Sequence, residues 1–178
     1  LSRLCGGNPL YALEIARDAA RDSRFPASVV FAVPTGLGAL VRTRLENLSP
    51  TASNAVLLAA TASQPTSALI ERAGGTVDGL REAIEQGVIE LDGSRLRFAH
   101  PLLASVTYES AYPWQRREAH LALAEVVDDP EERARHLALG TEETSEAIAA
   151  ELESAAELAA DRGSPESAAQ LAEHAARL

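Results

Sequence analysis

The sequence of 178 residues contains no methionine and no lysine, and all 16 of its basic residues are arginines. A natural chain begins with methionine, so a sequence that opens with Leu1 and contains none is expected to be processed or to be an internal piece of a longer protein. We favour the internal piece. Without lysine, the GxxxxGK[ST] phosphate loop cannot occur anywhere in this sequence.

Cysteine, aromatic residues and long apolar runs are also scarce. The single cysteine, Cys5, excludes an internal disulfide and a multi-cysteine zinc site and fits a reducing compartment. Aromatic residues make up 4% of the chain against 35 alanines and 24 leucines, which disfavours a large β-sandwich or barrel and favours helices. No run approaches the ~18 apolar residues of a membrane span, and there is no signal segment. We therefore expect a soluble, cytoplasmic protein with no membrane partner.

Charge is unevenly distributed along the chain, which carries a net −10. Residues 1–44 carry +3, residues 45–129 carry −6 and residues 130–178 carry −7. Most of the chain should therefore repel a phosphate backbone.

Helix starts are marked by a capping residue followed by proline, which loses nothing at the first helical position by lacking its N–H. In the N-terminal part, a first helix is predicted to run to about Asp22, and an amphipathic stripe that ends at Leu48 predicts a second. These two helices would form a small, slightly basic unit over residues 1–48. The four clearest helix starts are Asn8-Pro9, Ser49-Pro50, Asp129-Pro130 and Ser164-Pro165.

The next segment, residues 49–112, has the order of a winged helix domain. Three short helices are predicted over 49–63, 66–73 and 76–86, and the only strong strand signal follows them. Strands near 88–91 and 95–98 flank Asp92-Gly93, a dipeptide suited to a tight turn between antiparallel strands. A further helix from Pro101 to about Ala111 would pack after the hairpin.

Beyond Pro113 the pattern is helical throughout. Helices are predicted over 113–127, 130–140, 142–162 and 165–178, with small residues along their apolar faces. Residues 113–178 therefore fit the start of an array of antiparallel, TPR-like helical hairpins. We expect the last hairpin to be incomplete, its final helix lacking a partner, which would allow self-association there.

Catalytic motifs are mostly missing. There is no GxSxG elbow and no HExxH pair, and the GxG of residues 36–38 lacks both a preceding strand and a third glycine. The spacing of His120, His136 and His174 offers no metal site, and we interpret all three as solvated helix-surface residues. We expect neither a metal nor an enzymatic activity from this chain.

Two short segments carry more specific signals. Gly7, Asn8 and Pro9 place a glycine and a capping residue directly before a helix start, where backbone N–H groups converge. His100 stands between the second predicted strand and the next helix start, where an anion would be favoured by the helix dipole. An ordinary turn and an ordinary capping or packing histidine are the alternative interpretations.

Five motifs in order make the chain recognisable, and together they span nearly all of it. In this order and spacing they resemble the large ATP-binding transcriptional regulators of the LuxR type, a group of signal-transducing switch ATPases. The motifs are Gly6-Gly7-Asn8-Pro9-Leu10-Tyr11-Ala12-Leu13-Glu14, Leu40-Val41-Arg42-Thr43-Arg44-Leu45, Gly87-Val88-Ile89-Glu90-Leu91, Arg97-Phe98-Ala99-His100-Pro101-Leu102-Leu103 and Glu131-Glu132-Arg133-Ala134-Arg135-His136-Leu137-Ala138.

The resemblance implies a mainly α fold with three parts: a helical lid (1–48), a winged helix with one β-hairpin (49–112) and the start of a TPR-like array (113–178). It implies that Gly7, Asn8 and Pro9 contact the nucleotide, with Pro9 against the adenine. His100 is similar to the histidine that, in relatives, contacts the β-phosphate of ADP. Here Phe98-Ala99 precede it and Pro101 replaces the acidic residue of the family's motif. ATP or ADP would bind in the full-length parent rather than tightly to this fragment.

The leading hypothesis is accordingly a regulatory segment without chemistry of its own. It would couple an upstream ATPase core to a downstream helical sensor array for an effector ligand or protein, and DNA would be bound only by a C-terminal helix-turn-helix outside this sequence. The alternative is a free-standing winged helix DNA-binding protein with a helical dimerisation arm. The acidic helix predicted over 76–86 argues against that alternative. A free-standing enzyme, the third hypothesis, lacks any catalytic constellation.

Overall fold

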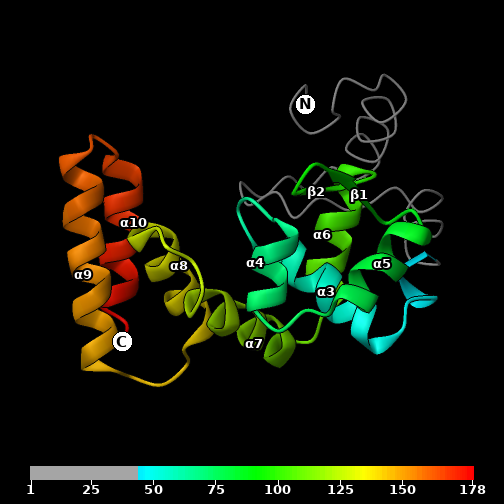
Figure 1. Cartoon of the computed structure of the whole chain (residues 1–178). Coiled ribbons are helices and arrows are strands. Elements are labelled where there is room, and N and C mark those ends of the chain that lie inside the picture. The colour runs from blue at the N-terminus through cyan, green and yellow to red at the C-terminus, as the bar shows by residue number, and fades with distance from the viewer. Residues whose placement is uncertain (1–43) are drawn as a thin grey trace, which may run out of the picture.

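The computed structural model describes residues 44–178, and this part of the chain is mainly helical with one two-stranded antiparallel sheet (Figure 1). Two groups of elements are separated in space, and α7 lies between them. In chain order the elements are α3 (Pro50–Thr61), α4 (Ser67–Arg72), α5 (Val77–Glu85), β1 (Ile89–Asp92), β2 (Arg95–Phe98), α6 (Pro101–Ser110), α7 (Pro113–Ala124), α8 (Pro130–Gly140), α9 (Glu146–Asp161) and α10 (Pro165–Ala175).

Three of the predicted helix starts are confirmed. Helices α3, α8 and α10 begin at the prolines that follow Ser49, Asp129 and Ser164. The Ser49 hydroxyl accepts the Ala52 N–H at 3.2 Å, and the Asp129 carboxylate accepts two N–H groups of the first turn of α8. These bonds satisfy donors that a helix end leaves without intrahelical partners. The fourth predicted start, Asn8-Pro9, lies outside the described residues.

The hairpin forms where the sequence predicts it, but its turn is displaced by one residue. Asp92 pairs with Arg95, so the two-residue loop is Gly93-Ser94 rather than Asp92-Gly93. Of the two loop residues, only Gly93 has a positive φ, +63°. This fits a two-residue loop that needs a positive φ at its first position alone. Ser94 then remains in ordinary backbone space.

The segment before α4 also pairs with β2. Thr66 forms an isolated antiparallel bridge with Arg95, and the Leu96 N–H donates to the Pro65 carbonyl at 2.9 Å. The Ser67 N–H donates to the Ser94 carbonyl at 3.1 Å. The hairpin is therefore attached to the helices by main-chain bonds on its β2 side.

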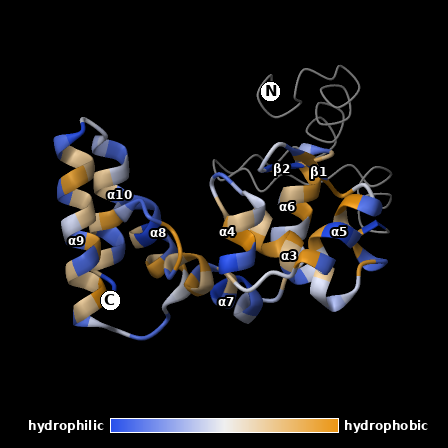
Figure 2. Ribbon diagram, in the orientation of Figure 1, coloured by the Kyte–Doolittle hydropathy of each residue, from blue (hydrophilic) through white to orange (hydrophobic). Residues whose placement is uncertain are grey.

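Apolar residues gather in two separate cores, and polar residues cover the outer faces of the helices (Figure 2). The first core is built from α3 to α7 and both strands and includes Leu58, Ile70, Ile89 and Leu123. The second core belongs to α8, α9 and α10 and is formed mainly by alanines around Leu152 and Leu171. Small side chains allow these three helices to approach closely.

The last helix has a partner, which corrects the expectation of an incomplete hairpin. Helix α10 packs along α9 over most of its length, and α8 packs against α7 and α9. Helix α9 begins at Glu146, four residues later than predicted, because Ser145 caps it by accepting the Ile148 N–H. Within residues 44–178 no helix has the length and apolarity to cross a membrane.

Candidate functional site

A buried polar cluster lies where the two cores meet, at the contact between α7 and α8. The Nδ1 atoms of His120 on α7 and His136 on α8 are 2.8 Å apart, a hydrogen-bonding distance. Nε2 of His120 lies 2.8 Å from the Tyr108 hydroxyl of α6. Both histidine residues are only 4% exposed. The cluster thus links α6 of the first core to α8 of the second.

Burial favours the neutral form of both rings. Desolvation, together with smaller effects of the neighbouring His136 and Arg116, lowers the pKa of His120 to about 4. Desolvation also lowers the pKa of His136, although the Glu132 carboxylate, 3.8 Å from its Nε2, opposes that shift. Near neutral pH the pair is therefore uncharged.

Further polar contacts cross this junction nearer to solvent. Glu132 on α8 accepts the backbone N–H of Ser63, which follows α3, at 3.2 Å. Arg117 on α7 forms an ion pair with Glu142, which follows α8. We call this set of contacts, together with the histidine pair, the seam.

The closest apolar approach at the seam depends on a glycine. A Cβ atom at Gly140, the last residue of α8, would lie 2.8 Å from side-chain atoms of Leu121 and 3.2 Å from its backbone nitrogen. Leu121 itself is 40% exposed. The seam therefore has close packing at one end and a hydrogen-bonded pair inside, but no shared apolar core.

The structure corrects the interpretation of His120 and His136 as solvated surface residues, whereas His174 is partly exposed. A signal for His120 was present in the sequence, because it stands three and four residues before Leu123 and Ala124, which are buried on the same face of α7. Spacing along one helix cannot show that a second buried histidine faces it from the next helix. The contacts of Tyr108 with His120 and of Glu132 with His136 leave no signal in the sequence.

His100 occupies the N-cap of α6. Its Nδ1 accepts the Leu102 N–H at 3.1 Å, so the neutral ring carries its proton on Nε2. Partial burial lowers the pKa of the ring. The capping interpretation therefore describes its contact in this structure, and a role toward nucleotide stays a proposal. Gly7, Asn8 and Pro9 lie outside the described residues.

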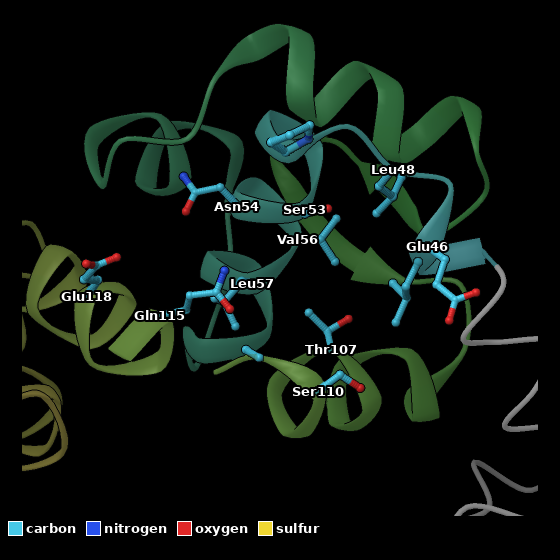
Figure 3. Close-up of a pocket in the computed structure, with 13 residues that line it drawn as sticks. Glu46, Leu48, Ser53, Asn54, Val56, Leu57, Thr107, Ser110, Gln115 and Glu118 are labelled. Atoms are coloured by element: carbon cyan, nitrogen blue, oxygen red, sulfur yellow. The ribbon is translucent and has the colours of Figure 1, made fainter. Parts of the chain in front are cut away.

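A pocket of about 640 Å³ lies beside α3, α6 and α7 (Figure 3). Val56 and Leu57 give it an apolar wall, and Asn54, Gln115 and Glu118 give it a polar rim. The hydroxyl of Thr107, which also lines it, is buried without a hydrogen-bond partner.

Among residues 44–178 there is no cluster of three or more histidine, cysteine, aspartate or glutamate side chains that could hold a metal ion.

Comparisons with known proteins add no relative: no protein-family model, no curated protein and no solved structure matches this chain.

Proposed function

We propose that this chain is a regulatory segment of a nucleotide-switched transcriptional regulator. In this proposal, residues 1–48 are the lid of an upstream ATPase core, residues 49–112 are a winged helix domain and residues 113–178 begin a TPR-like array that carries an effector sensor. The segment itself performs no reaction. It couples the nucleotide state of the core to the conformation of the array, and it couples effector binding at the array to the state of the core.

The observation that carries this proposal is the seam between two apolar cores. A relay element needs two units that are each stable and a contact between them that can be rearranged. Here each unit has its own core, and α7 contributes Leu123 to the first core. Helix α8 meets α7 through the His120–His136 pair, surface polar contacts and the close approach of Gly140 to Leu121. Because the two cores are separate clusters, a rearrangement of α7 against α8 could leave each of them assembled.

The winged helix assignment is supported by the order and pairing of elements. Helix α3 is followed by a short extended segment at Thr66, then by α4, α5 and the β1–β2 hairpin. The extended segment pairs with β2, which places three short extended pieces beside three helices. This order and pairing support the winged helix domain of the proposal.

Charge on α5 favours a protein-facing role over DNA binding. In the proposed winged helix, α5 would be the recognition helix, and its one basic residue, Arg81, is paired with Asp78 at 2.7 Å. Glu82 and Glu85 add negative charge to the same helix. A helix that enters a DNA groove normally presents basic and amide side chains to phosphates and bases. The free-standing DNA-binding protein is therefore the weaker candidate.

The proposal can be tested with the coding sequence and with calorimetry. We expect a P-loop to be encoded upstream of Leu1, and we expect ADP to bind a protein extended to include it. The 178-residue chain alone should show no micromolar binding of ADP, because the phosphate loop with its lysine is not in it. Absence of an upstream P-loop, or micromolar ADP binding by this chain alone, would contradict the proposal.

A further inference from the structure

The protons of the buried histidine pair have one favoured arrangement when both rings are neutral. Nε2 of His136 faces the Glu132 carboxylate at 3.8 Å, so a proton is attracted there and a lone pair would be repelled. Nδ1 of His136 is then an acceptor, and it accepts the Nδ1–H of His120. Nε2 of His120 in turn accepts the Tyr108 hydroxyl.

One additional proton can be accommodated by reversing this chain. If His136 becomes doubly protonated, its Nδ1–H donates to Nδ1 of His120. The proton of His120 then resides on Nε2 and is donated to the Tyr108 oxygen. The charged His136 ring lies beside Glu132, so the added charge has a partner.

A second additional proton cannot be accommodated in the closed seam. Both rings would then carry N–H groups at Nδ1 atoms that are 2.8 Å apart, and neither atom could accept. Two positive charges would also face each other in a buried position. Because one ring belongs to α7 and the other to α8, relief of this contact requires the two helices to separate.

We propose that the His120–His136 pair is a proton-controlled latch between the core of α3 to α7 and the unit of α8 to α10. The latch stays closed while the pair carries at most one additional proton, and it opens when both rings are protonated. Double protonation favours opening because the surface ion pair across the seam stabilises little. The packing of Gly140 against Leu121 is the contact that opening must also give up. This inference does not rest on the proposed nucleotide switch.

The charged groups around the pair support this behaviour. Arg116 lies over the Tyr108 ring, 5.4 Å from its centroid, and opposes protonation of His120, while Arg135 opposes protonation of His136. Glu132 is the acidic group that favours it. Helix α3, which packs on α7, has no titratable side chain. The charged residues on the other face of α8 are paired with the end of α9 or with α9 itself: Arg133 with Glu151, and Glu131 with Arg162. Near the end of α10, Glu173 pairs with Arg177.

Hydrogen exchange of the 178-residue chain measures the opening directly. Amides of α8 are followed from pH 7.5 to 5.5, corrected for intrinsic exchange, with amides of α5 as the internal reference. With an open-state histidine pKa of about 6.5, uptake of one proton raises the opening constant about tenfold over this range, and uptake of two raises it about a hundredfold. We expect a rise of more than tenfold for α8 and none of this size for α5. A rise of tenfold or less would overturn the latch.

Two variants isolate the pair. In His136→Asn the side-chain oxygen still accepts the His120 Nδ1–H but cannot titrate, so the rise should fall to tenfold or less. His174→Gln removes a histidine outside the seam and should leave the rise unchanged. An undiminished rise in His136→Asn would overturn the proposal.

A measurement on the unsubstituted chain decides the matter even if His136→Asn fails to fold. Ring ¹⁵N spectra at pH 7.5 should show the proton of His120 on Nδ1 and that of His136 on Nε2. On acidification, full protonation of both rings should coincide with loss of α8 protection. Identical tautomers, or two charged rings with α8 still protected, would refute the latch.

Discussion

The Glu82 carboxylate accepts both the backbone N–H and the hydroxyl of Ser49, at 2.7 and 2.5 Å, across 33 residues of sequence. The same hydroxyl caps α3 through the Ala52 N–H. One carboxylate on α5 therefore orients the residue that starts α3, and it fixes the angle between two helices that pack closely in the first core.

The first prediction concerns this contact. Both Ser49 donors lower the pKa of Glu82, so its ionised form stabilises the fold above the ordinary value of 4.5. That stabilisation is lost as pH falls below 4.5 through the lowered pKa. Glu82→Gln should reduce Tm at pH 7 and flatten the decline of stability in acid. Glu85→Gln, an exposed change on the same helix, should leave both unchanged, and equal effects of the two variants would contradict the role assigned to Glu82.

The second prediction concerns the close contact between α5 and α3. A Cβ atom at Gly79 would lie 2.6 Å from the backbone oxygen of Thr51, which cannot rotate away as a side chain can. Alanine favours a helix over glycine by roughly 1 kcal/mol, but overpacking costs about 1–3 kcal/mol. Gly79→Ala should therefore destabilise the chain in urea denaturation. Glu85→Ala is the control without a steric conflict, and a stabilised Gly79→Ala chain would disprove the tight contact.

Helix starts and the hairpin were predictable because their signals are local. A capping residue before Pro50 or Pro130 acts within one turn of helix, and the alternation around Gly93 acts within a few residues. The displaced hairpin turn differs from the prediction by a single residue of register. That register is fixed by the pairing of Asp92 with Arg95, which a dipeptide preference does not specify.

The seam was not predictable because it depends on contacts between elements. His120 and His136 are each an isolated histidine on a helix until α7 and α8 are packed together. The partner of α10 was missed for the same reason, since a helical pattern shows an apolar face but not which neighbour covers it. Residues that touch only across a packed junction leave at most one-sided signals in sequence.

The third prediction isolates the hydroxyl of Tyr108. Its hydrogen bond to His120 should contribute about 1 kcal/mol, so Tyr108→Phe should lower the free energy of unfolding by about that amount at pH 7. It should also shift the proton of His120 toward a mixture of tautomers in ring ¹⁵N spectra. Tyr112→Phe changes an exposed ring stacked on Trp114 and serves as the control. Unaltered tautomers in Tyr108→Phe would show that the hydroxyl does not orient the ring.

The fourth prediction separates the two candidate functions. A net charge of −10 and an acidic α5 should prevent binding to random duplex DNA at ~0.1 M salt, where the Debye length is about 10 Å. An electrophoretic shift assay should show no complex. Glu85→Gln, which removes an exposed negative charge from α5 and leaves the Glu82–Ser49 contact intact, should change this little if α5 faces protein. Tight, salt-dependent binding by the unsubstituted chain would favour the free-standing DNA-binding protein.

The last prediction separates the capping role of His100 from a contact with ADP, and it rests on the proposed function. Nδ1 of His100 caps α6 by accepting the Leu102 N–H, and the proposed contact with the phosphate would be made by Nε2–H when the winged helix closes on the core. In His100→Asn the side-chain oxygen can replace Nδ1 as the cap, whereas the Nε2–H is lost. His100→Ala loses both, with a capping cost of about 1 kcal/mol.

In a protein that includes the ATPase core, both variants should therefore release ADP faster and raise basal transcription. One charge-assisted hydrogen bond contributes roughly 1.5–3 kcal/mol, which corresponds to about a tenfold to hundredfold shift from the closed to the open state. Only His100→Ala should also lose thermal stability. If His100→Asn releases ADP at the unsubstituted rate with normal stability, the histidine acts on the helix alone, because the cap would be the one function that both side chains share.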